Sequence, residues 1–406
     1  MIGIADYEKV VGKNIVEELK LISKSLKRKK IQCINSTRTG GGVAEILSRL
    51  IPLMEDLGIK ASWDVIKADA DYFNVTKAFH NALHGKKGNI SQRMFDKFLS
   101  EGESIIKDTE IYGDIVFVHD PQPIMLIEKK SSSNKWIWRC HVDVSRPYME
   151  VWEFLRQFIE QYDSSVFSSP KFARTLNIPQ FLVAPSIDPF SEKNRDLSKE
   201  EISDALGRYG IKKDKPIIAQ VSRFDYLKDP LGVIDSYRLV KKYIDCQLIL
   251  AGNRAADDPE TDIVYREIME KKGKDEDIHV LLIAPEKNDI DVNAIQRSAD
   301  VVVQKSIREG FALTITEALW KARPVVASAV GGIPQQISHR YSGLLCHTVE
   351  GAALEIREVL NNPEYAKRLG RNGKEHVRRN FLSTRHLRDY MMLFLYLYNP
   401  DDIIYL

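Results

Sequence analysis

Residues 306–319 read SIREGFALTITEAL and lie just after the apolar run VVV at 301–303. A β-branched run of this kind predicts a buried strand of a parallel sheet. Helix formers at helical spacing predict a helix over residues 313–321. The short loop between the two elements carries Glu309 and Gly310. The segment therefore predicts a strand, a loop and a helix of an α/β fold.

The start of this helix is a candidate binding site for an anion. Backbone N–H groups in residues 311–314 have no partner inside the helix, and the helix dipole adds partial positive charge there. Glu309 precedes this point and Glu317 lies about one turn inside the helix, and each carboxylate can accept hydrogen bonds from two neighbouring sugar hydroxyls. A phosphate flanked by two such carboxylates indicates a sugar nucleotide. The alternative is that Glu309 is an ordinary loop acid and that Glu317 pairs with Lys321 on a solvated face.

The composition argues against several classes of function. The 406 residues are 44% hydrophobic and 29% charged, which is typical of a soluble protein of two or three domains. The formal net charge of +2 provides no overall field for nucleic acid or an anionic membrane. Residues 1–30 lack the apolar core of a signal peptide, and the apolar stretch at 390–398 is too short to span a bilayer. We therefore expect a cytoplasmic protein with no nucleic-acid and no membrane partner.

The four cysteines, Cys33, Cys140, Cys246 and Cys346, are far apart in the sequence. They show no metal-ligand spacing among themselves or with histidine. Each lies in or beside an apolar run, so we expect four reduced thiols in the core and no metal site.

Two series of strand-like runs divide the chain. They occur at 31–35, 61–66, 114–118, 136–140, 165–167 and 181–184, and again at 216–221, 247–251, 278–283, 299–303 and 324–327. Helical segments alternate with these runs, which predicts parallel sheets covered on both faces. A charged stretch at 185–214 separates the two series. We predict two doubly wound, Rossmann-like domains, residues 1–187 and 188–379, that face each other across a cleft. A C-terminal helix within residues 380–406 is expected to cross back to the first domain.

Three glycines, Gly40, Gly41 and Gly42, stand between the first strand-like run and a helical segment at 43–57. They leave no side chain at the carboxyl end of a parallel strand, where open α/β sheets bind ligands, so a ligand can approach the backbone closely. The pattern fits neither a Walker loop nor G-x-G-x-x-G, and a tight turn is the alternative.

Polar side chains follow two further strands of the first domain. They are His119, Asp120 and Gln122 after the run at 114–118, and His141 and Asp143 after the run at 136–140. Such positions are site candidates because the crevice of a parallel sheet opens at the carboxyl ends of its strands. For His119 the alternative is a satisfied histidine of the core.

A helix predicted over residues 71–85 places Asn74, Lys77, His80 and Asn81 on one polar face. That face can hydrogen-bond a sugar that accepts a transferred group. The alternative is a face that meets only solvent.

Arg223 and Lys228 lie in the loop after the first strand of the second domain. Two cations in such a loop can hold a diphosphate whose negative charge grows as a bond to it breaks. The alternative is that both are surface charges paired with Asp225 and Asp229.

Arg223 and Lys228, followed by Glu309 and Glu317 with seven residues between the glutamates, resemble the retaining glycosyltransferases of the GT-B fold, family four. The resemblance covers nearly the whole chain. It implies that Arg223 and Lys228 hold the donor diphosphate, that Glu309 contacts the transferred sugar and that Glu317 contacts the ribose. The implied donor-binding residues are Gly40, Gly41, Gly42, Arg223, Lys228, Glu309, Gly310, Phe311, Ala312, Leu313, Thr314 and Glu317. Relatives often have Pro-Glu after a later glycine turn, whereas Gln335 follows Pro334 here, so we assign no role to that position.

Residues 73–77 and 80–81, with residues 118–123, resemble the trehalose synthase branch, which transfers glucose from a nucleotide donor to free glucose. The resemblance implies UDP- or ADP-glucose and glucose as partners, and His119 as a fourth catalytic residue beside Arg223, Lys228 and Glu309. The implied acceptor-binding residues are Asn74, Lys77, Asp120, Gln122, Arg139 and Asp143. We expect no tightly bound cofactor, while activation by Mg²⁺ and a homodimer stay open. Trehalose phosphorylase, a UDP-sugar epimerase on the same fold and a non-catalytic sugar-binding module are the alternatives.

Overall fold

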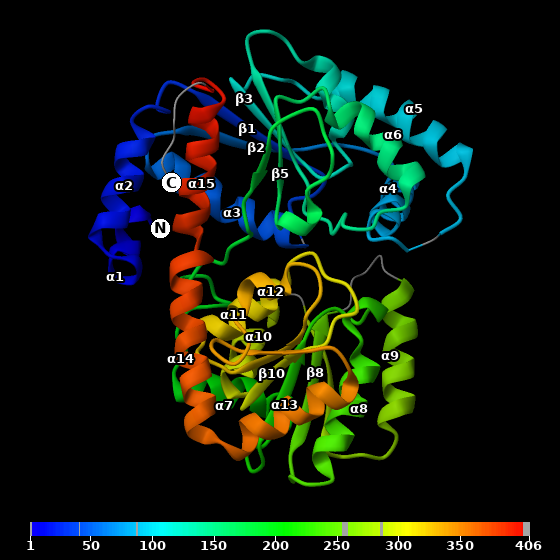
Figure 1. Cartoon of the computed structure of the whole chain (residues 1–406), viewed down its shortest axis with the longest axis vertical. Helices are drawn as coiled ribbons and strands as arrows, with labels where there is room; N and C mark the ends of the chain where they lie inside the picture. Colours follow the sequence, from blue (N-terminus) through cyan, green and yellow to red (C-terminus); the bar gives the residue numbers. More distant parts are fainter. Residues whose placement is uncertain (1, 40, 87, 254–258, 285–286, 401–406) are drawn as a thin grey trace. The chain divides into compact units, whose positions relative to one another are not determined.

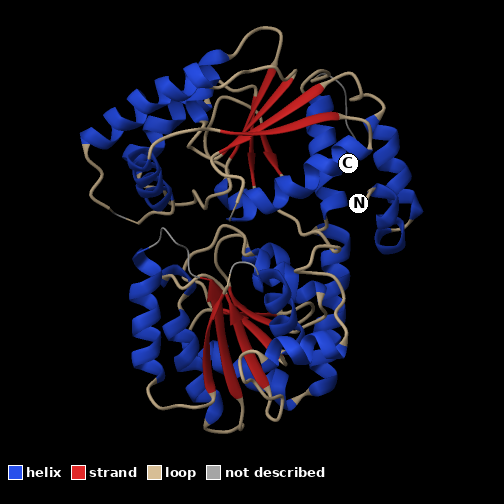
Figure 2. Cartoon of the chain, turned by 180° about the vertical axis from the view of Figure 1, so that it is seen from behind, coloured by secondary structure: helices blue, strands red, loops and turns tan. Residues whose placement is uncertain are grey.

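The computed structural model describes residues 2–39, 41–86, 88–253, 259–284 and 287–400. The chain divides into two compact units: the first comprises Met1–Ser186 and Ser383–Leu406, and the second comprises Ile187–Leu382. Each unit contains a parallel sheet of six strands that is covered by helices (Figures 1 and 2). The predicted α/β class with two doubly wound domains is therefore confirmed.

The first unit is built on a sheet with the strand order β2-β1-β3-β4-β5-β6. Its strands are β1 (Lys30–Asn35), β2 (Lys60–Val65), β3 (Ile115–His119), β4 (Lys135–Arg139), β5 (Ser164–Phe167) and β6 (Gln180–Leu182). All neighbouring strands pair in parallel. The order reverses between β1 and β3, so the carboxyl ends of these two strands mark the edge at which such sheets bind ligands.

The C-terminal helix α15 (Ser383–Tyr396) belongs to the first unit. It packs beside α2 and α3 (Figure 1). From β3, the ring of Phe117 lies 4.9 Å from that of Tyr390 and 5.9 Å from that of Phe394, both in α15. The helix thus fills part of the core, which confirms the predicted return of the chain to its first domain. The other helical elements of this unit are η1 (Ile4–Tyr7), α1 (Glu8–Val11), α2 (Lys13–Ser23), α3 (Gly41–Asp56), α4 (Ala70–Leu83), α5 (Gln92–Asp108), η2 (Ile124–Lys129), α6 (Met149–Ile159) and η3 (Pro170–Phe172).

The second unit has the strand order β12-β11-β10-β7-β8-β9. Its strands are β7 (Ile217–Val221), β8 (Gln247–Asn253), β9 (Ile278–Ile283), β10 (Val301–Gln304), β11 (Val325–Ser328) and β12 (Leu344–Cys346). The order reverses between β7 and β10, and these two strands lead into the loops that carry Arg223 and Glu309. The fold therefore brings the two predicted donor-binding loops to one edge of one sheet.

Local sequence explains how the helices of the second unit begin. Ser198 and Glu201 form a capping box at the start of α7 (Lys199–Gly207). Pro230 and Pro363 occupy the first positions of α8 (Pro230–Lys241) and α14 (Pro363–Asn380), where a missing N–H is harmless. The remaining helical elements are η4 (Tyr226–Lys228), α9 (Pro259–Lys272), α10 (Asn288–Ser298), α11 (Leu313–Trp320), α12 (Ile333–Gln336) and α13 (Val349–Asn361).

Burial of apolar side chains follows the sequence pattern. Every residue of β3, β7 and β10 is buried, in line with their nearly continuous apolar runs. In β4, the rings of Trp136 and Trp138 are both completely buried. Among the helices in the described part of the chain, none combines the length and the apolar character that crossing a membrane requires.

Candidate functional site

The loop between β10 and α11 is held in place by the glycine turn that follows β11. A Cβ atom on Gly331 would lie 1.7 Å from the carbonyl oxygen of Glu309, and one on Gly332 would lie 2.4 Å from that of Gly310. Gly331 also has a φ of +52°, in the left-handed region that favours glycine. Glycine is therefore required at both positions for the loop to keep Glu309 in its present place.

Gln336 forms hydrogen bonds with the same loop and with α11. Its Nε2 donates to the carbonyl oxygen of Phe311, and its Oε1 accepts a hydrogen bond of 2.5 Å from the Thr316 hydroxyl of α11. The Gln336 side chain is completely buried. The sequence analysis did not single out this residue, because its partners lie 20 and 25 residues away along the chain.

The start of α11 is open to a ligand. Ala312 precedes the helix with a φ of +69°, a left-handed conformation that costs a residue with a Cβ atom about 1–2 kcal/mol and is concentrated at functional sites. No backbone N–H group from Gly310 to Thr314 donates a hydrogen bond to another residue that the structure describes. These amides and the positive end of the helix dipole are therefore available to an anion.

Glu309 is a buried, paired carboxylate. Its Oε2 lies 2.5 Å from the ammonium of Lys228 and accepts a 3.2 Å hydrogen bond from the Ser306 hydroxyl. The two loops are also joined by a 2.8 Å hydrogen bond from the Ile307 backbone N–H to the carbonyl oxygen of Leu227. Because Glu309 is only 9% exposed, it is not an ordinary solvated loop acid.

The loop after β7 distributes its charges over several partners. Arg223, with a side chain that is 54% exposed, lies 3.3 Å from Asp225. Asp229 caps α8 with a φ of +49° and pairs with Lys305. Arg223 thus pairs with Asp225, as the surface-charge alternative expects, whereas Lys228 pairs with Glu309. The structure places Arg223 and Lys228 in the same short loop, and Lys228 next to the start of α11.

Glu317 is buried on α11, with 2% of its surface exposed. Its carboxylate accepts a 3.4 Å hydrogen bond from the Gln296 amide and lies 3.9 Å from the Lys193 ammonium. The Lys321 ammonium donates to the backbone carbonyl of Glu317 at 3.2 Å. The alternative of a solvated face is therefore wrong for this residue. Lys193 and Gln296 were missed in the sequence because they lie far from Glu317 along the chain.

In the first unit, the glycine loop opens α3. Gly40 lies outside the described residues. Gly41 has a φ of +77°, and a Cβ atom built on it would meet nothing within 4 Å. Gly42 is exposed in the first turn of α3. The described part of the loop therefore leaves space beside its backbone.

Asn74 and Lys77 are exposed on α4. Tyr72 of the same helix donates a 2.6 Å hydrogen bond to the carbonyl oxygen of Gln122. The buried Oε1 of Gln122 accepts no hydrogen bond from the described residues. These contacts join α4 to the loop after β3 and bring three of the predicted acceptor-binding residues onto neighbouring segments.

Asp120 and Asp143 both support backbone turns. Asp120 has a φ of +66° and its Oδ1 accepts a 2.9 Å hydrogen bond from the His141 backbone N–H. Burial raises the pKa of Asp120 to about 6, against the lowering influence of that hydrogen bond and of Arg139. Asp143 is buried, and its Oδ1 accepts a 2.9 Å hydrogen bond from the Ser145 backbone N–H.

His119 and Arg139 lie inside the first unit. Nδ1 of His119 shares a 3.1 Å hydrogen bond with Nε2 of His141. Arg139 is completely buried, donates to the Val183 carbonyl oxygen at 2.7 Å and has its guanidinium 5.6 Å from the centre of the Tyr390 ring. Burial, with Arg139 as a second cause, lowers the pKa of His119 to about 3. In this structure Arg139 is therefore covered, while Asn74 and Lys77 are exposed.

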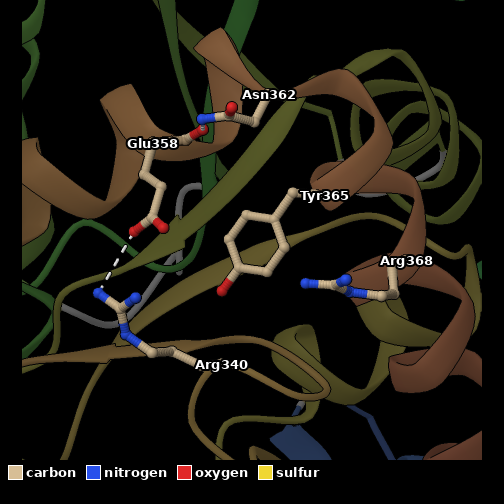
Figure 3. Close-up of a pocket in the computed structure, with 5 residues that line it drawn as sticks. All are labelled: Arg340, Glu358, Asn362, Tyr365 and Arg368. Atoms are coloured by element: carbon tan, nitrogen blue, oxygen red, sulfur yellow. Dashed lines mark hydrogen bonds and ion pairs between the residues drawn. The ribbon is translucent and has the colours of Figure 1, made fainter.

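A surface pocket of about 380 Å³ lies elsewhere in the second unit (Figure 3). It is lined by Arg340, Glu358, Asn362, Tyr365 and Arg368. Arg340 lies 3.4 Å from Glu358 and 3.8 Å from Glu355. The pocket contains none of the predicted site residues.

The described residues contain no group of three histidine, cysteine or acidic side chains arranged to hold a metal ion. The four cysteines are buried free thiols. Burial raises the pKa of Cys33 to about 12 and that of Cys246 to about 11. These two thiols are therefore protonated and unreactive at neutral pH.

Comparison with known proteins identifies the family. Residues 33–174 match the family "Trehalose synthase, N-terminal domain", and residues 201–376 match the family "Glycosyl transferases group 1". The trehalose synthase of Thermococcus litoralis is 44% identical over 395 residues, covering 96% of each chain. The trehalose phosphorylase of Grifola frondosa is more distant, with 30% identity over 407 residues that cover 86% of this chain and 55% of that one. A solved trehalose-6-phosphate synthase, 13% identical, superimposes with a TM-score of 0.72 over 92% of this chain and 99% of its own, which supports the predicted GT-B fold. The chain therefore belongs to the trehalose synthase family of group 1 glycosyltransferases.

Proposed function

We propose that the protein transfers glucose from UDP-glucose or ADP-glucose to free glucose and forms α,α-trehalose with retained anomeric configuration. The observation that carries this proposal is the start of α11, where the amides of residues 310–314 donate to no other described residue and follow directly after Glu309, the partner of Lys228. Cations and these amides can bind the diphosphate, and a buried carboxylate next to them can bind the sugar hydroxyls of the same ligand. The similarity to trehalose synthases supports trehalose as the product.

On the donor side, the diphosphate binds to Arg223, Lys228 and the amides before α11. A bound phosphate competes with Glu309 for the Lys228 ammonium, which frees the Glu309 carboxylate to accept hydrogen bonds from the transferred glucose. Glu317 accepts hydrogen bonds from the ribose hydroxyls. Its neighbours Lys193 and Gln296 hold this buried carboxylate in place.

The chemical step breaks the bond between the anomeric carbon and the diphosphate oxygen. Positive charge develops on the sugar and negative charge on the leaving oxygen, which Arg223, Lys228 and the α11 amides stabilise. A double-displacement route would need a carboxylate free to attack the anomeric carbon. In this proposal Glu309 accepts hydrogen bonds from the hydroxyls of the transferred glucose and Glu317 from those of the ribose, so neither carboxylate is assigned as the nucleophile and we favour a front-face route. In that route the leaving phosphate takes the proton of the attacking hydroxyl.

The acceptor glucose is bound by polar groups of the first unit, with Asn74, Lys77, Asp120, Gln122 and Asp143 as contacts. His119 orients the donor sugar. The cationic pair Arg223 and Lys228 supplies the charge that a metal often provides in phosphate chemistry. We therefore propose that turnover requires no tightly bound cofactor and that Mg²⁺ acts at most as an activator.

A panel of nucleotide sugars, each incubated with and without glucose, tests the proposal. We expect α,α-trehalose, identified by NMR, from UDP- or ADP-glucose only when glucose is present. Conversion of the donor without glucose would instead indicate an epimerase. Inactivity with the whole panel would indicate a sugar-binding module.

Phosphorolysis is the second candidate because the chain is also related to a trehalose phosphorylase. Trehalose is incubated separately with phosphate, with UDP and with ADP. We expect a nucleotide sugar from UDP or ADP and no glucose 1-phosphate from phosphate. Glucose 1-phosphate as the main product would overturn the proposed transfer.

A further inference from the structure

A polar cluster that surrounds His119 lies at the ends of β3 and β4. We name it the histidine-arginine cluster, and it consists of His119, Arg139, His141, Arg385, His386 and Tyr390. His119 and Arg139 are direct neighbours in the β3–β4 register. His386 and Tyr390 lie one turn apart on α15, with ring centres 4.4 Å apart. The guanidinium of Arg139 over the Tyr390 ring joins the strand residues to the helix residues.

The contact between His119 and His141 links the states of the two rings. The rings are stacked, with centres 5.4 Å apart and planes 22° apart, and Nδ1 of His119 shares a 3.1 Å hydrogen bond with Nε2 of His141. One of these nitrogens carries the shared hydrogen and the other accepts it. If His119 donates, its Nε2 is an acceptor; if His141 donates, Nε2 of a neutral His119 is a donor. The hydrogen bond with His141 therefore determines whether Nε2 of His119 can donate a hydrogen bond to a ligand or accept one from it.

The Nε2 atom of His119 is the free end of this pair. It is buried and forms no hydrogen bond with any residue in the described part of the chain. Buried polar atoms are normally satisfied, so a partner from outside the protein is expected here. A sugar hydroxyl can both donate and accept and would satisfy Nε2 in either state.

The charges around His119 oppose a second proton on its ring. The titratable or charged groups around it are Asp120 directly after β3, Arg139 on β4, His141 after β4, and Arg385, His386 and Tyr390 on α15. Arg139 and Arg385 are cations, of which Arg385 pairs with Asp389 at 2.8 Å, and Asp120 is the carboxylate nearest to His119 in sequence. Burial and nearby cations lower the pKa values of His119, His141 and His386 alike. A charged imidazolium next to Arg139 would also place two buried cations side by side.

We infer that Arg139 and His141 are positioning residues that keep His119 neutral and in one tautomer, so that its Nε2 presents a fixed hydrogen bond to a sugar hydroxyl. This role replaces direct sugar contact for Arg139, which is completely buried. It also gives α15 a part in the site, because Tyr390 covers the guanidinium. The inference rests on the proposed glucosyl transfer for its kinetic readout only.

The test compares His141→Gln with His141→Leu in the full chain. Glutamine can place an amide where Nε2 of His141 lies, whereas leucine fills the space without a polar atom. His347→Gln, at an exposed position of the second unit, is the matched control. Nitrogen NMR of labelled histidine side chains reports the tautomer and the protonation of each ring, and steady-state kinetics report turnover.

We expect a single neutral tautomer of His119 between pH 5 and 8 in the wild type and in His141→Gln. In His141→Leu we expect a mixture of tautomers and a turnover number that is lower by about tenfold, with an unchanged KM for the donor. Arg139→Met should raise the pKa of His119 and shift the acid limb of the pH–rate profile to higher pH. Arg139→Lys, which keeps a cation, should restore the wild-type profile.

A mixture of His119 tautomers in the wild type would overturn the inference, as would an unchanged tautomer in His141→Leu. Should Arg139→Met fail to fold, the comparison of the His141 variants still decides the question. If the tautomers behave as expected but no glucosyl transfer is detected, the proposed function fails and the inference about the rings stands.

Discussion

At the residue scale, the ion pair between Lys228 and Glu309 is expected to contribute to stability without a ligand and to binding when a ligand is present. Without a ligand, each side chain neutralises a buried partner, since removing one member of such a pair leaves an uncompensated charge. With a diphosphate bound, the same lysine can turn to the phosphate and release the carboxylate. Arg223 differs because its side chain is 54% exposed, although it lies 3.3 Å from Asp225. Its contribution is therefore expected to appear in catalysis rather than in folding.

Arg223→Ala should lower the turnover number about a hundredfold with both substrates saturating. The loss follows from removing one group that stabilises the leaving diphosphate. Initial rates over a grid of donor and acceptor concentrations measure it. The melting temperature should stay within a few degrees of the wild type. Wild-type turnover in this variant would remove Arg223 from the site.

Glu317→Ala should chiefly raise the KM for the donor, by about tenfold, because two hydrogen bonds to the ribose are lost in the ground state and in the transition state alike. Glu317→Gln keeps the shape and one acceptor, so its KM should lie between those of the alanine variant and the wild type. Equal donor KM values in all three proteins would contradict a ribose contact.

At the element scale, the conformation of the candidate loops depends on contacts with neighbouring segments. The loop before α11 rests on the glycine turn after β11 and is tied by Gln336 of α12. Its left-handed residue Ala312 has counterparts in the other candidate loops, at Asp120 and Asp229. Strained backbone at all three loops indicates that the surrounding elements fix their shape.

Gly331→Ala should displace the loop that carries Glu309, because the new methyl group would overlap the Glu309 carbonyl oxygen. We expect a loss of about 1–3 kcal/mol in the free energy of unfolding and a large loss of turnover. Gly207→Ala is the matched control, since a Cβ atom there meets nothing within 4 Å. It lies at the last position of α7 and should be neutral or slightly stabilising. Urea denaturation and initial rates distinguish the two, and equal behaviour would refute the packing argument.

At the scale of the whole molecule, the sequence was sufficient for the fold class but not for the contacts. The apolar runs of β7 and β10 predicted buried parallel strands, and the loops after them were found where expected. The partners Lys193, Gln296 and Gln336 were not found because each contact joins residues that are distant in sequence. Arg139 was assigned to the sugar because it lies at the carboxyl end of a predicted parallel strand, where the crevice of such a sheet opens. The pattern therefore did not indicate that its guanidinium is covered by Tyr390 of α15.

Acid should destabilise the protein below about pH 6.5. His119, His141 and His386 have lowered pKa values when folded, so unfolding takes up protons as the pH falls below the value of an unfolded histidine. Each such group removes about 1.4 kcal/mol of stability per pH unit. Asp120 has a raised pKa in the folded protein, so it binds a proton more readily there than in the unfolded chain. Below about pH 6 its effect on the free energy of unfolding therefore cancels that of one of the three histidines.

Urea denaturation between pH 7 and pH 5 measures this slope. His386→Asn, which can keep the 2.9 Å hydrogen bond to Ser186, removes one titrating group and should flatten the slope. A slope equal to that of the wild type would show that His386 is not buried in the neutral form.

The placement of α15 also sets the order in which the chain can complete its two cores. The ribosome releases the first unit's sheet early, but Tyr390 and Phe394, which contact Phe117, are made only after the whole second unit. The second unit ends at Leu382 and has all its residues sooner. The unit whose synthesis begins first is therefore the unit that must wait longer for the residues of its core.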